Sequence, residues 1–73
     1  MPKKLSYQQI IGQAIRHHRN AVGMSQEKLA EKANLHPVYF GQVERGEQTV
    51  SIYALMRIAK ALGVRVRDLV AEI

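Results

Sequence analysis

The sequence predicts an all-α protein, a compact bundle of five short helices that contains a helix-turn-helix. Apolar residues recur at three- and four-residue spacings, as they do on the buried side of a helix. Helix-capping and helix-ending residues alternate along the chain, and no segment has the pattern of a β-strand. A chain of 73 residues is close to the size at which one hydrophobic core becomes marginal. We therefore expect a basic tail over residues 1–5 and a single domain over residues 6–73.

A first helix is expected to begin after Ser6 and to end at Gly23. Ser6 and Gln9 have the spacing of a capping box, in which each side chain binds the backbone N–H of the other residue. The residues expected on the inner side of this helix are Ile10, Ile11, Ala14, Ile15 and Val22.

A second helix is expected over residues 26–33, with Ser25 as its N-cap. Asn34 should end this helix, because Asn tolerates the left-handed backbone conformation that a sharp turn requires. The apolar stripe of the helix consists of Leu29, Ala30 and Ala33, and its charged residues face water.

A third helix is expected to start at Pro37, where the missing N–H of proline costs nothing, and to run to about Arg45 before Gly46. Together with the second helix it makes residues 25–46 a helix-turn-helix. A small residue faces the crossing of the two helices, a turn residue follows four positions later, and two apolar residues anchor the third helix. These four residues are Ala30, Asn34, Phe40 and Val43.

Two further helices complete the predicted bundle. Ser51 should cap the fourth helix, which ends at Gly63. Its expected inner residues are Ile52, Leu55, Ile58, Ala59 and Leu62, and the short last helix contains Val64, Val66, Leu69 and Val70.

The segment SQEKLAEKANLHPVYFGQVERG, residues 25–46, resembles the helix-turn-helix of the lambdoid phage repressor and Cro family, also called the XRE family. The similarity extends to the basic residues 16–19 before the motif and to ERGEQTVSIYALMRIAKALGVRVRDL after it, so that it covers roughly residues 8–70. The resemblance implies a lambda repressor-like bundle of five short helices. It also implies binding as a dimer to a near-palindromic operator in double-stranded DNA.

Composition agrees with a nucleic-acid binder. Eleven Lys and Arg against six Asp and Glu give a net charge of +5, and the isoelectric point is about 10.0. The absence of cysteine excludes disulfides and thiolate zinc sites and fits a reducing cytoplasm of bacterial or phage type. No apolar run is long enough to span a membrane, and the first residues lack the apolar region of a signal peptide.

The outer face of the third helix is expected to enter the major groove of DNA. Gln42 is the strongest candidate for reading a base, since its amide can bind adenine through two hydrogen bonds, and Val38 can contact a thymine methyl group. His36 can instead cap the helix, and both His36 and Pro37 fit equally well as plain exposed residues. The expected base-contacting set is His36, Pro37, Val38 and Gln42. Pro37 and Val38 stand where the resembling family often has polar residues.

The resemblance also implies that Gln26, first in the second helix, binds a DNA phosphate, and helix N-termini favour anions. Tyr39 is open to two interpretations, a phosphate contact or a half-buried position against the second helix. Glu47 has the wrong charge for DNA and is expected to point away from it. The full set of expected phosphate contacts is Gln26, Tyr39, Arg45, Gln48, Thr49, Lys3 and Lys4, although the two lysines equally fit a solvated tail.

Two further residues of the third helix carry expectations. The resemblance implies that Glu44 pairs with Arg19 and so ties the first helix to the third. Gly41 should cost the helix about 1 kcal/mol relative to alanine. It either permits a close approach of DNA or a partner, or is merely tolerated.

The sequence argues against catalysis and against metal or cofactor binding. His17 and His18 are neighbours on a helix and point about 100° apart, so they cannot share a metal, and His36 does not complete a ligand set. No side chains have the spacing of a nucleophile with its base. We expect no enzymatic activity, no metal, no cofactor and no small-molecule ligand.

The predicted function is that of a sequence-specific DNA-binding transcriptional regulator. One domain this small reads too few base pairs for a specific site, so we expect a homodimer that forms through the C-terminal helices. Candidates for its apolar contact are Tyr53, Met56, Val66, Val70 and Ile73. Phage-type repressor, restriction–modification controller and antitoxin all remain open, as does a helical protein-interaction module without DNA binding.

Overall fold

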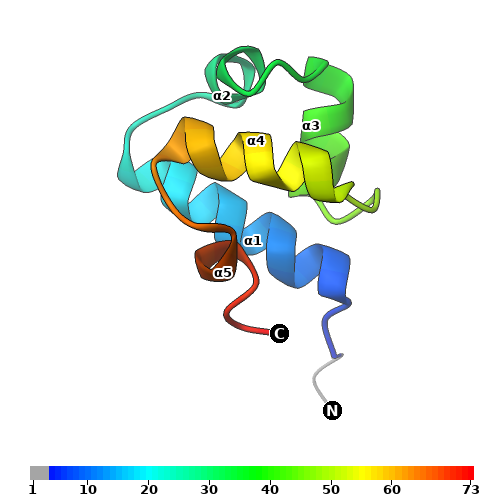
Figure 1. The fold of residues 1–73 in the computed structure, drawn as a ribbon. Helices are drawn as coiled ribbons and strands as arrows, with labels where there is room; N and C mark the ends of the chain where they lie inside the picture. Colours follow the sequence, from blue (N-terminus) through cyan, green and yellow to red (C-terminus); the bar gives the residue numbers. More distant parts are fainter. Residues whose placement is uncertain (1–3) are drawn as a thin grey trace.

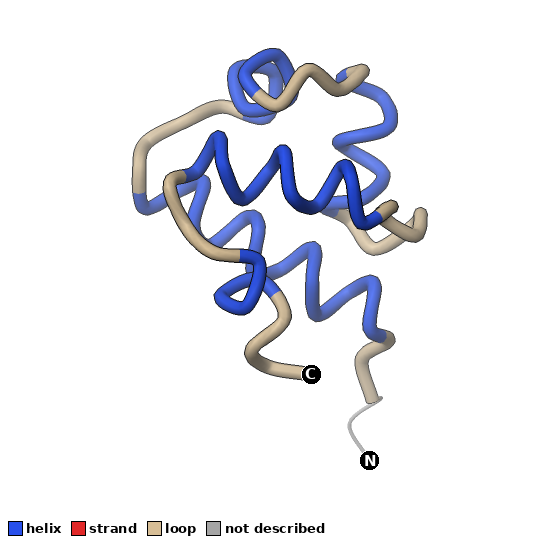
Figure 2. Tube along the Cα trace, viewed as in Figure 1, coloured by secondary structure: helices blue, strands red, loops and turns tan. Residues whose placement is uncertain are grey.

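The computed structural model describes residues 4–73 and contains five helices in this range. They are α1 (Tyr7–Ala21), α2 (Gln26–Lys32), α3 (Pro37–Glu44), α4 (Ile52–Leu62) and α5 (Val66–Leu69). Helices and loops account for the whole described chain, which confirms the predicted all-α class (Figure 2). The expected N-terminal tail is described only at Lys4 and Leu5, so Lys3 lies outside the described residues.

Serine caps begin three of the helices, as the sequence predicts. The backbone N–H of Gln9 donates to Oγ of Ser6 at 3.1 Å, and the N–H of Ser6 donates to Oε1 of Gln9 at 2.9 Å, so the capping box is complete. Ser25 accepts from the N–H of Lys28 at 3.0 Å, and Ser51 accepts from that of Ala54 at 3.0 Å. These short polar contacts satisfy backbone donors that have no partner inside the helix.

The turn between α2 and α3 depends on Asn34. Its φ of 57° is the one positive value among the non-glycine residues that the structure describes. That left-handed conformation reverses the chain within a few residues, so α3 starts at Pro37 and crosses α2 steeply (Figure 1). Asn34 thus ends α2 as expected, through its left-handed backbone conformation.

The core lies where α1 and α4 pack together with the inner sides of the other helices. In Figure 1, α2 and α3 lie at one end of the bundle and α5 lies against α1 and α4. The largest fully buried side chains are Ile15, Leu29, Phe40, Val43, Ile58 and Leu69. Ala30 is also fully buried, which lets α2 and α3 approach each other closely at the crossing.

Two of the residues predicted to face inward are exposed. Val22 follows the last residue of α1, where the chain has already left the helical path. Ile52 is the first residue of α4, and a helix turns about 100° per residue, which directs its side chain away from the core. Ala54 and Ala61 are buried in α4 instead. Within residues 4–73, no helix combines the length and the apolar character that crossing a bilayer demands.

Gly12 allows α1 to lie directly on the C-terminal end of α3. A Cβ atom at this buried position would lie 2.8 Å from the carbonyl oxygen of Val43 and would also collide with that of Glu44. Backbone atoms cannot move aside as a flexible side chain would. The missing side chain therefore lets the middle of α1 lie next to the end of α3.

We predict that Gly12→Ala lowers the free energy of unfolding by about 1–3 kcal/mol, because the added methyl group forces α1 and α3 apart. Urea denaturation followed by circular dichroism measures this change. Gln13→Ala, an exposed change in the same helix, should stay within about 0.5 kcal/mol of the wild type. Equal midpoints for the two variants would show that the close approach of α1 and α3 is not required.

Candidate nucleic-acid interface

Helix α3 is locked on one side and open on the other. Phe40, Val43 and Glu44 are buried against the bundle. On the opposite side, residues four and seven positions after Val38 share its face of the helix. Val38 is 61% exposed, Gln42 is half-buried and Arg45 is exposed. The open face of α3 therefore presents Val38, Gln42 and Arg45 to solvent. Helix α3 itself lies at the edge of the bundle (Figure 1).

His36 caps the open end of α3. Its Nδ1 accepts a hydrogen bond from the backbone N–H of Val38 at 3.1 Å, so this nitrogen carries no proton and Nε2 carries it. Of the roles expected for His36, the structure therefore uses the cap, and it leaves the Nε2–H free to donate outward. Pro37 is exposed beside it at the first helical position.

A buried carboxylate joins α3 to α1. The side chain of Glu44 is 0% exposed and that of Arg19 is 13% exposed. Arg19 binds both carboxylate oxygens, with Nε 2.9 Å from Oε2 and a terminal nitrogen 2.7 Å from Oε1. Its other terminal nitrogen donates to the carbonyl oxygen of Met24 at 2.9 Å. The structure thus brings together the pair that the resemblance implied, in the two-pronged geometry that gives the strongest ion pairs.

Two further side chains converge on the same carboxylate. Nε2 of Gln26 lies 3.0 Å from Oε1 of Glu44, and Nε of Arg16 lies 3.2 Å from this oxygen. A carboxylate only accepts hydrogen bonds, so it fixes the amide of Gln26 with its nitrogen toward Glu44. The amide nitrogen has two N–H groups, and the second remains available for the phosphate contact expected of Gln26.

Opposing effects set the pKa of Glu44. Burial by itself would raise it, but the hydrogen bonds from Arg19, Gln26 and Arg16 outweigh burial and hold the pKa below the usual 4.5. The carboxylate is therefore bound more strongly in its charged form. Its contribution to stability is present above about pH 4.5 and is lost as the pH falls through the lower value of the folded protein.

Arg45 and Glu47 form an exposed ion pair at the end of α3. Nε of Arg45 lies 2.9 Å from Oε2 of Glu47, and a terminal nitrogen lies 3.2 Å from Oε1. The hydrogen bond from Arg45 lowers the pKa of Glu47. Glu47, which is expected to point away from DNA, lies against Arg45, a residue expected to bind phosphate. The pairing offsets the positive charge of Arg45.

Gly41 lies beneath the side chain of Arg45. A Cβ atom on Gly41 would lie 3.1 Å from a terminal nitrogen of Arg45. The residue is buried, so an added side chain would meet Arg45 within the protein. Because the guanidinium is at the end of a flexible chain, it can shift for a small side chain at this position.

Tyr39 uses its hydroxyl group within the protein. The hydroxyl accepts a hydrogen bond from the backbone N–H of Ser51 at 3.2 Å. It also donates one to the carbonyl oxygen of Thr49 at 3.4 Å. Of the two interpretations of Tyr39, the structure agrees with a half-buried side chain, but the hydroxyl contacts the loop before α4 and not α2. The side chains of Gln48 and Thr49 are exposed on this loop.

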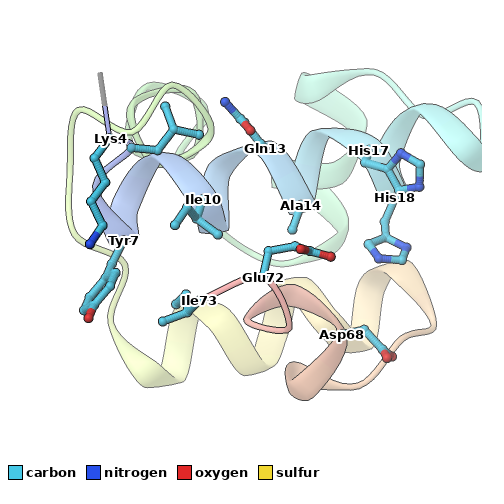
Figure 3. Close-up of a pocket in the computed structure, with 11 residues that line it drawn as sticks. Lys4, Tyr7, Ile10, Gln13, Ala14, His17, His18, Asp68, Glu72 and Ile73 are labelled. Atoms are coloured by element: carbon cyan, nitrogen blue, oxygen red, sulfur yellow. The ribbon is translucent and has the colours of Figure 1, made fainter. Parts of the chain in front are cut away.

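Lys4 lies away from α3. It lines a groove between α1 and the C-terminal residues, where Figure 3 shows Lys4 and Tyr7 at one end and His17 and His18 at the other. The two imidazole rings are 5.3 Å apart and nearly perpendicular. Residues 4–73 contain no group of three or more His, Asp or Glu side chains that could hold a metal.

The C-terminal apolar candidates divide into two groups. Tyr53 and Met56 are exposed on α4, and Ile73 is exposed at the chain end. Val66 and Val70 are instead half-buried and pack against the core, so they have less surface to offer a partner. The exposed Ile52 joins Tyr53 and Met56, and these three residues form what we call the α4 apolar patch.

Sequence reasoning missed two residues of this region. Arg16 was identified only as part of a basic stretch, and Gly12 was not singled out. The spacing of Arg16 and Arg19 places both on one face of a helix, which is a usable signal. Nothing in the sequence shows that the carboxylate of Glu44, which follows Arg19 by 25 positions, lies opposite that face.

The helix-turn-helix family profile matches residues 15–69, well over half of the chain. This chain belongs to that family of DNA-binding transcriptional regulators. The predicted resemblance is confirmed, and so is the lambda repressor-like fold. The family consists of regulators and not of enzymes.

Individual relatives agree with the assignment. The control protein C.SmaI of Serratia marcescens is 39% identical over 68 residues, which cover 93% of this chain and 81% of that protein. The restriction-modification controller protein C.AhdI from Aeromonas hydrophila has a crystal structure with a TM-score of 0.83 at 40% identity, covering 85% of this chain and 94% of that one. The regulator SinR in complex with DNA has a TM-score of 0.77 at 38% identity, covering 81% and 95%.

We predict that Glu44→Ala lowers the free energy of unfolding by about 3–5 kcal/mol, because Arg19 is then left buried without its partner. Urea denaturation at neutral pH measures the loss. Glu31→Ala removes an exposed carboxylate from α2 and should change stability by less than about 0.5 kcal/mol. A Glu44→Ala variant with the wild-type midpoint would contradict the structural role of this ion pair.

The low pKa of Glu44 predicts a specific acid sensitivity. The stability difference between wild type and Glu44→Gln should be largest near neutral pH and should shrink as the pH falls below about 4.5, since the wild-type carboxyl then takes up a proton. Parallel urea titrations between about pH 7 and pH 3 test this, with the variant correcting for all other carboxyl groups. A difference that stays constant over this range would show that the Glu44 pKa is not lowered by folding.

Proposed function

We propose that this protein occupies a DNA operator as a homodimer, with α3 of each subunit in the major groove. The observation that carries the proposal is the division of α3 into a locked side and an open side. Phe40, Val43 and the Glu44 ion pair hold the helix in place, while Val38 and Gln42 remain accessible. The major groove is about 12 Å wide and admits one helix, so a helix held at the rim in this way can reach base edges.

Base recognition by this surface rests on few polar groups. The amide of Gln42 and the Nε2–H of His36 are its hydrogen-bonding groups, and Val38 and Pro37 add apolar contact. Most of the affinity should therefore come from the DNA backbone, through Gln26, Gln48 and Thr49 and through the net charge of +5. Binding of this kind weakens steeply with increasing salt.

Dimerisation is supported by the α4 apolar patch. Ile52, Tyr53 and Met56 are exposed on one helix, although large apolar side chains normally avoid water when they lie together. We infer that the patch is buried against a second copy and that the dimer presents both α3 helices to the same DNA duplex. Their separation would be about 34 Å, one turn of DNA, if the operator has the usual spacing of half-sites.

Among the possible regulators, we favour a restriction–modification controller that acts on DNA in the cytoplasm. C.SmaI and C.AhdI are both described as control proteins, and the alignments cover most of each of them as well as most of this chain. The rival interpretation is a protein-interaction module without DNA binding. Filter binding to mixed duplex DNA at two salt concentrations separates them, because a module should not bind even at low salt.

Selection of bound duplexes from a random pool tests the proposal most directly. A regulator of this type should recover two related half-sites in inverted orientation, with their centres about 10 base pairs apart or a multiple of this. A recovered site without symmetry would contradict the dimer. Recovery of unrelated sequences would contradict specific recognition.

We predict that Gln42→Ala weakens binding to the selected operator by about 1–3 kcal/mol and relaxes the preference at one base position of each half-site. Competition binding with single-base operator variants measures both effects. Gln48→Ala is the matched comparison, since loss of a backbone contact should weaken operator and random DNA equally. An unchanged ratio of specific to random binding in Gln42→Ala would show that another residue reads this base.

A further inference from the structure

In the described part of the chain, the side chain of Arg16 makes one hydrogen bond to the protein, and about half of it is exposed to solvent. Its Nε lies 3.2 Å from Oε1 of Glu44, while its side chain is 52% exposed. Within residues 4–73, its two terminal nitrogens have no hydrogen-bond partner in the protein. A guanidinium carries five N–H groups, so four of them are available to an external acceptor. The hydrogen bond through Nε positions the guanidinium and leaves the edge formed by its two terminal nitrogens unused.

Among the described residues, Arg16 shares its only negatively charged partner, Glu44, with Arg19. Arg19 already balances the buried carboxylate of Glu44 through two short hydrogen bonds. Arg16 therefore adds a surplus positive charge to this cluster. Arg45 borders the same recess, together with Gln9, Gln13, Arg16 and Glu44, but Arg45 is paired with Glu47. The two arginines near the end of α3 thus differ in the charge that they offer to an anion.

Gln26 lies beside Arg16 because both donate to the same oxygen atom. The two nitrogens are 3.0 Å and 3.2 Å from Oε1 of Glu44. Glu44 is fully buried, so its negative charge does not face a ligand that approaches from outside. An anion at this point meets the spare N–H of Gln26 and the outer edge of Arg16. A guanidinium edge matches the spacing of two phosphate oxygens.

We propose that Arg16 and Gln26 form a clamp that binds one phosphate of the DNA backbone beside α3. This inference rests on the proposed function and adds Arg16 of α1 to the residues that hold DNA. Glu44 acts as a positioning residue: it orients both donors and touches no DNA. The Glu44 carboxylate then fixes the inner side of α3. It also sets the place where the DNA backbone is held against that helix. The clamp contacts no base, so it contributes affinity without sequence preference.

Equilibrium binding over a range of salt concentrations tests the clamp. Arg16→Gln should weaken binding to operator and to random DNA by about tenfold each, leaving their ratio unchanged. The slope of log affinity against log salt should become shallower by about 0.9, the value for one lost phosphate contact. Arg16→Lys keeps the charge and should restore the slope. Arg67→Gln is the matched control, because it removes the same charge from α5, which packs on α1 and α4, and it should leave the slope unchanged.

A double-mutant cycle tests whether the two residues share one phosphate. Gln26→Ala, Arg16→Gln and the double variant should show non-additive losses of affinity, because removing one donor displaces the phosphate from the other. Urea denaturation and mass measurement in solution confirm that each variant is folded and has the wild-type oligomeric state. Should Arg16→Gln itself be unstable, Gln26→Ala completes the test: it should weaken binding to operator and to random DNA equally, and a changed ratio would overturn the clamp.

The outcomes separate the clamp from the proposed function. If the wild type binds DNA and Arg16→Gln keeps its slope and affinity, the clamp is wrong and the proposed function stands. Additive losses in the cycle, or a changed ratio of operator to random binding, would also overturn it. If the wild type binds no DNA at low salt, the proposed function fails and the clamp fails with it.

Discussion

The carboxylate of Glu44 is the interaction on which the rest of this structure depends. A lone buried carboxylate would be too costly to keep ionised, so it must be matched by charge and by hydrogen bonds. Arg19 supplies the charge, and Gln26 and Arg16 complete the hydrogen bonds. These partners come from α1 and α2, whereas Glu44 ends α3. One side chain therefore joins the three helices that position the candidate DNA surface.

This polar centre works together with close backbone packing. Gly12 lets α1 lie on the carbonyl groups at the end of α3, and Ala30 lets α2 cross α3 at short range. Asn34 turns the chain between α2 and α3 without a long loop. Since every constraint acts on the inner side of α3, the opposite side is left free. The exposed face of the helix is thus a consequence of how the inner face is held.

The charges around α3 are unevenly paired. Arg45 and Glu47 neutralise each other at the end of the helix, while Arg16 is left with surplus charge on α1. A surface with few base-reading groups must obtain its affinity from the DNA backbone, and backbone contacts depend on where positive charge is placed. Under the proposed function, this pairing pattern decides which arginine near α3 offers unpaired N–H groups to a phosphate.

The sequence by itself determined the helices, their caps and the helix-turn-helix. Ser6, Ser25 and Ser51 act on N–H groups a few residues away, and the turn at Asn34 is equally local, so short-range patterns suffice to predict them. The failures at Val22 and Ile52 occur at helix ends, where the periodic pattern no longer decides direction. The ion pair of Arg19 with Glu44 was found through a family resemblance, because its partners are 25 residues apart.

Only the tertiary structure decided how the polar side chains pair. It placed Arg16 on Glu44, Arg45 on Glu47, and the hydroxyl of Tyr39 on the loop before α4. It also placed Lys4 in a groove beside the C-terminal residues. The physical reason is that a long polar side chain has several partners within reach, and the choice among them is made by which helices the core brings together. Helix formation is a local property of a chain, whereas the pairing of charges is a property of the packed bundle.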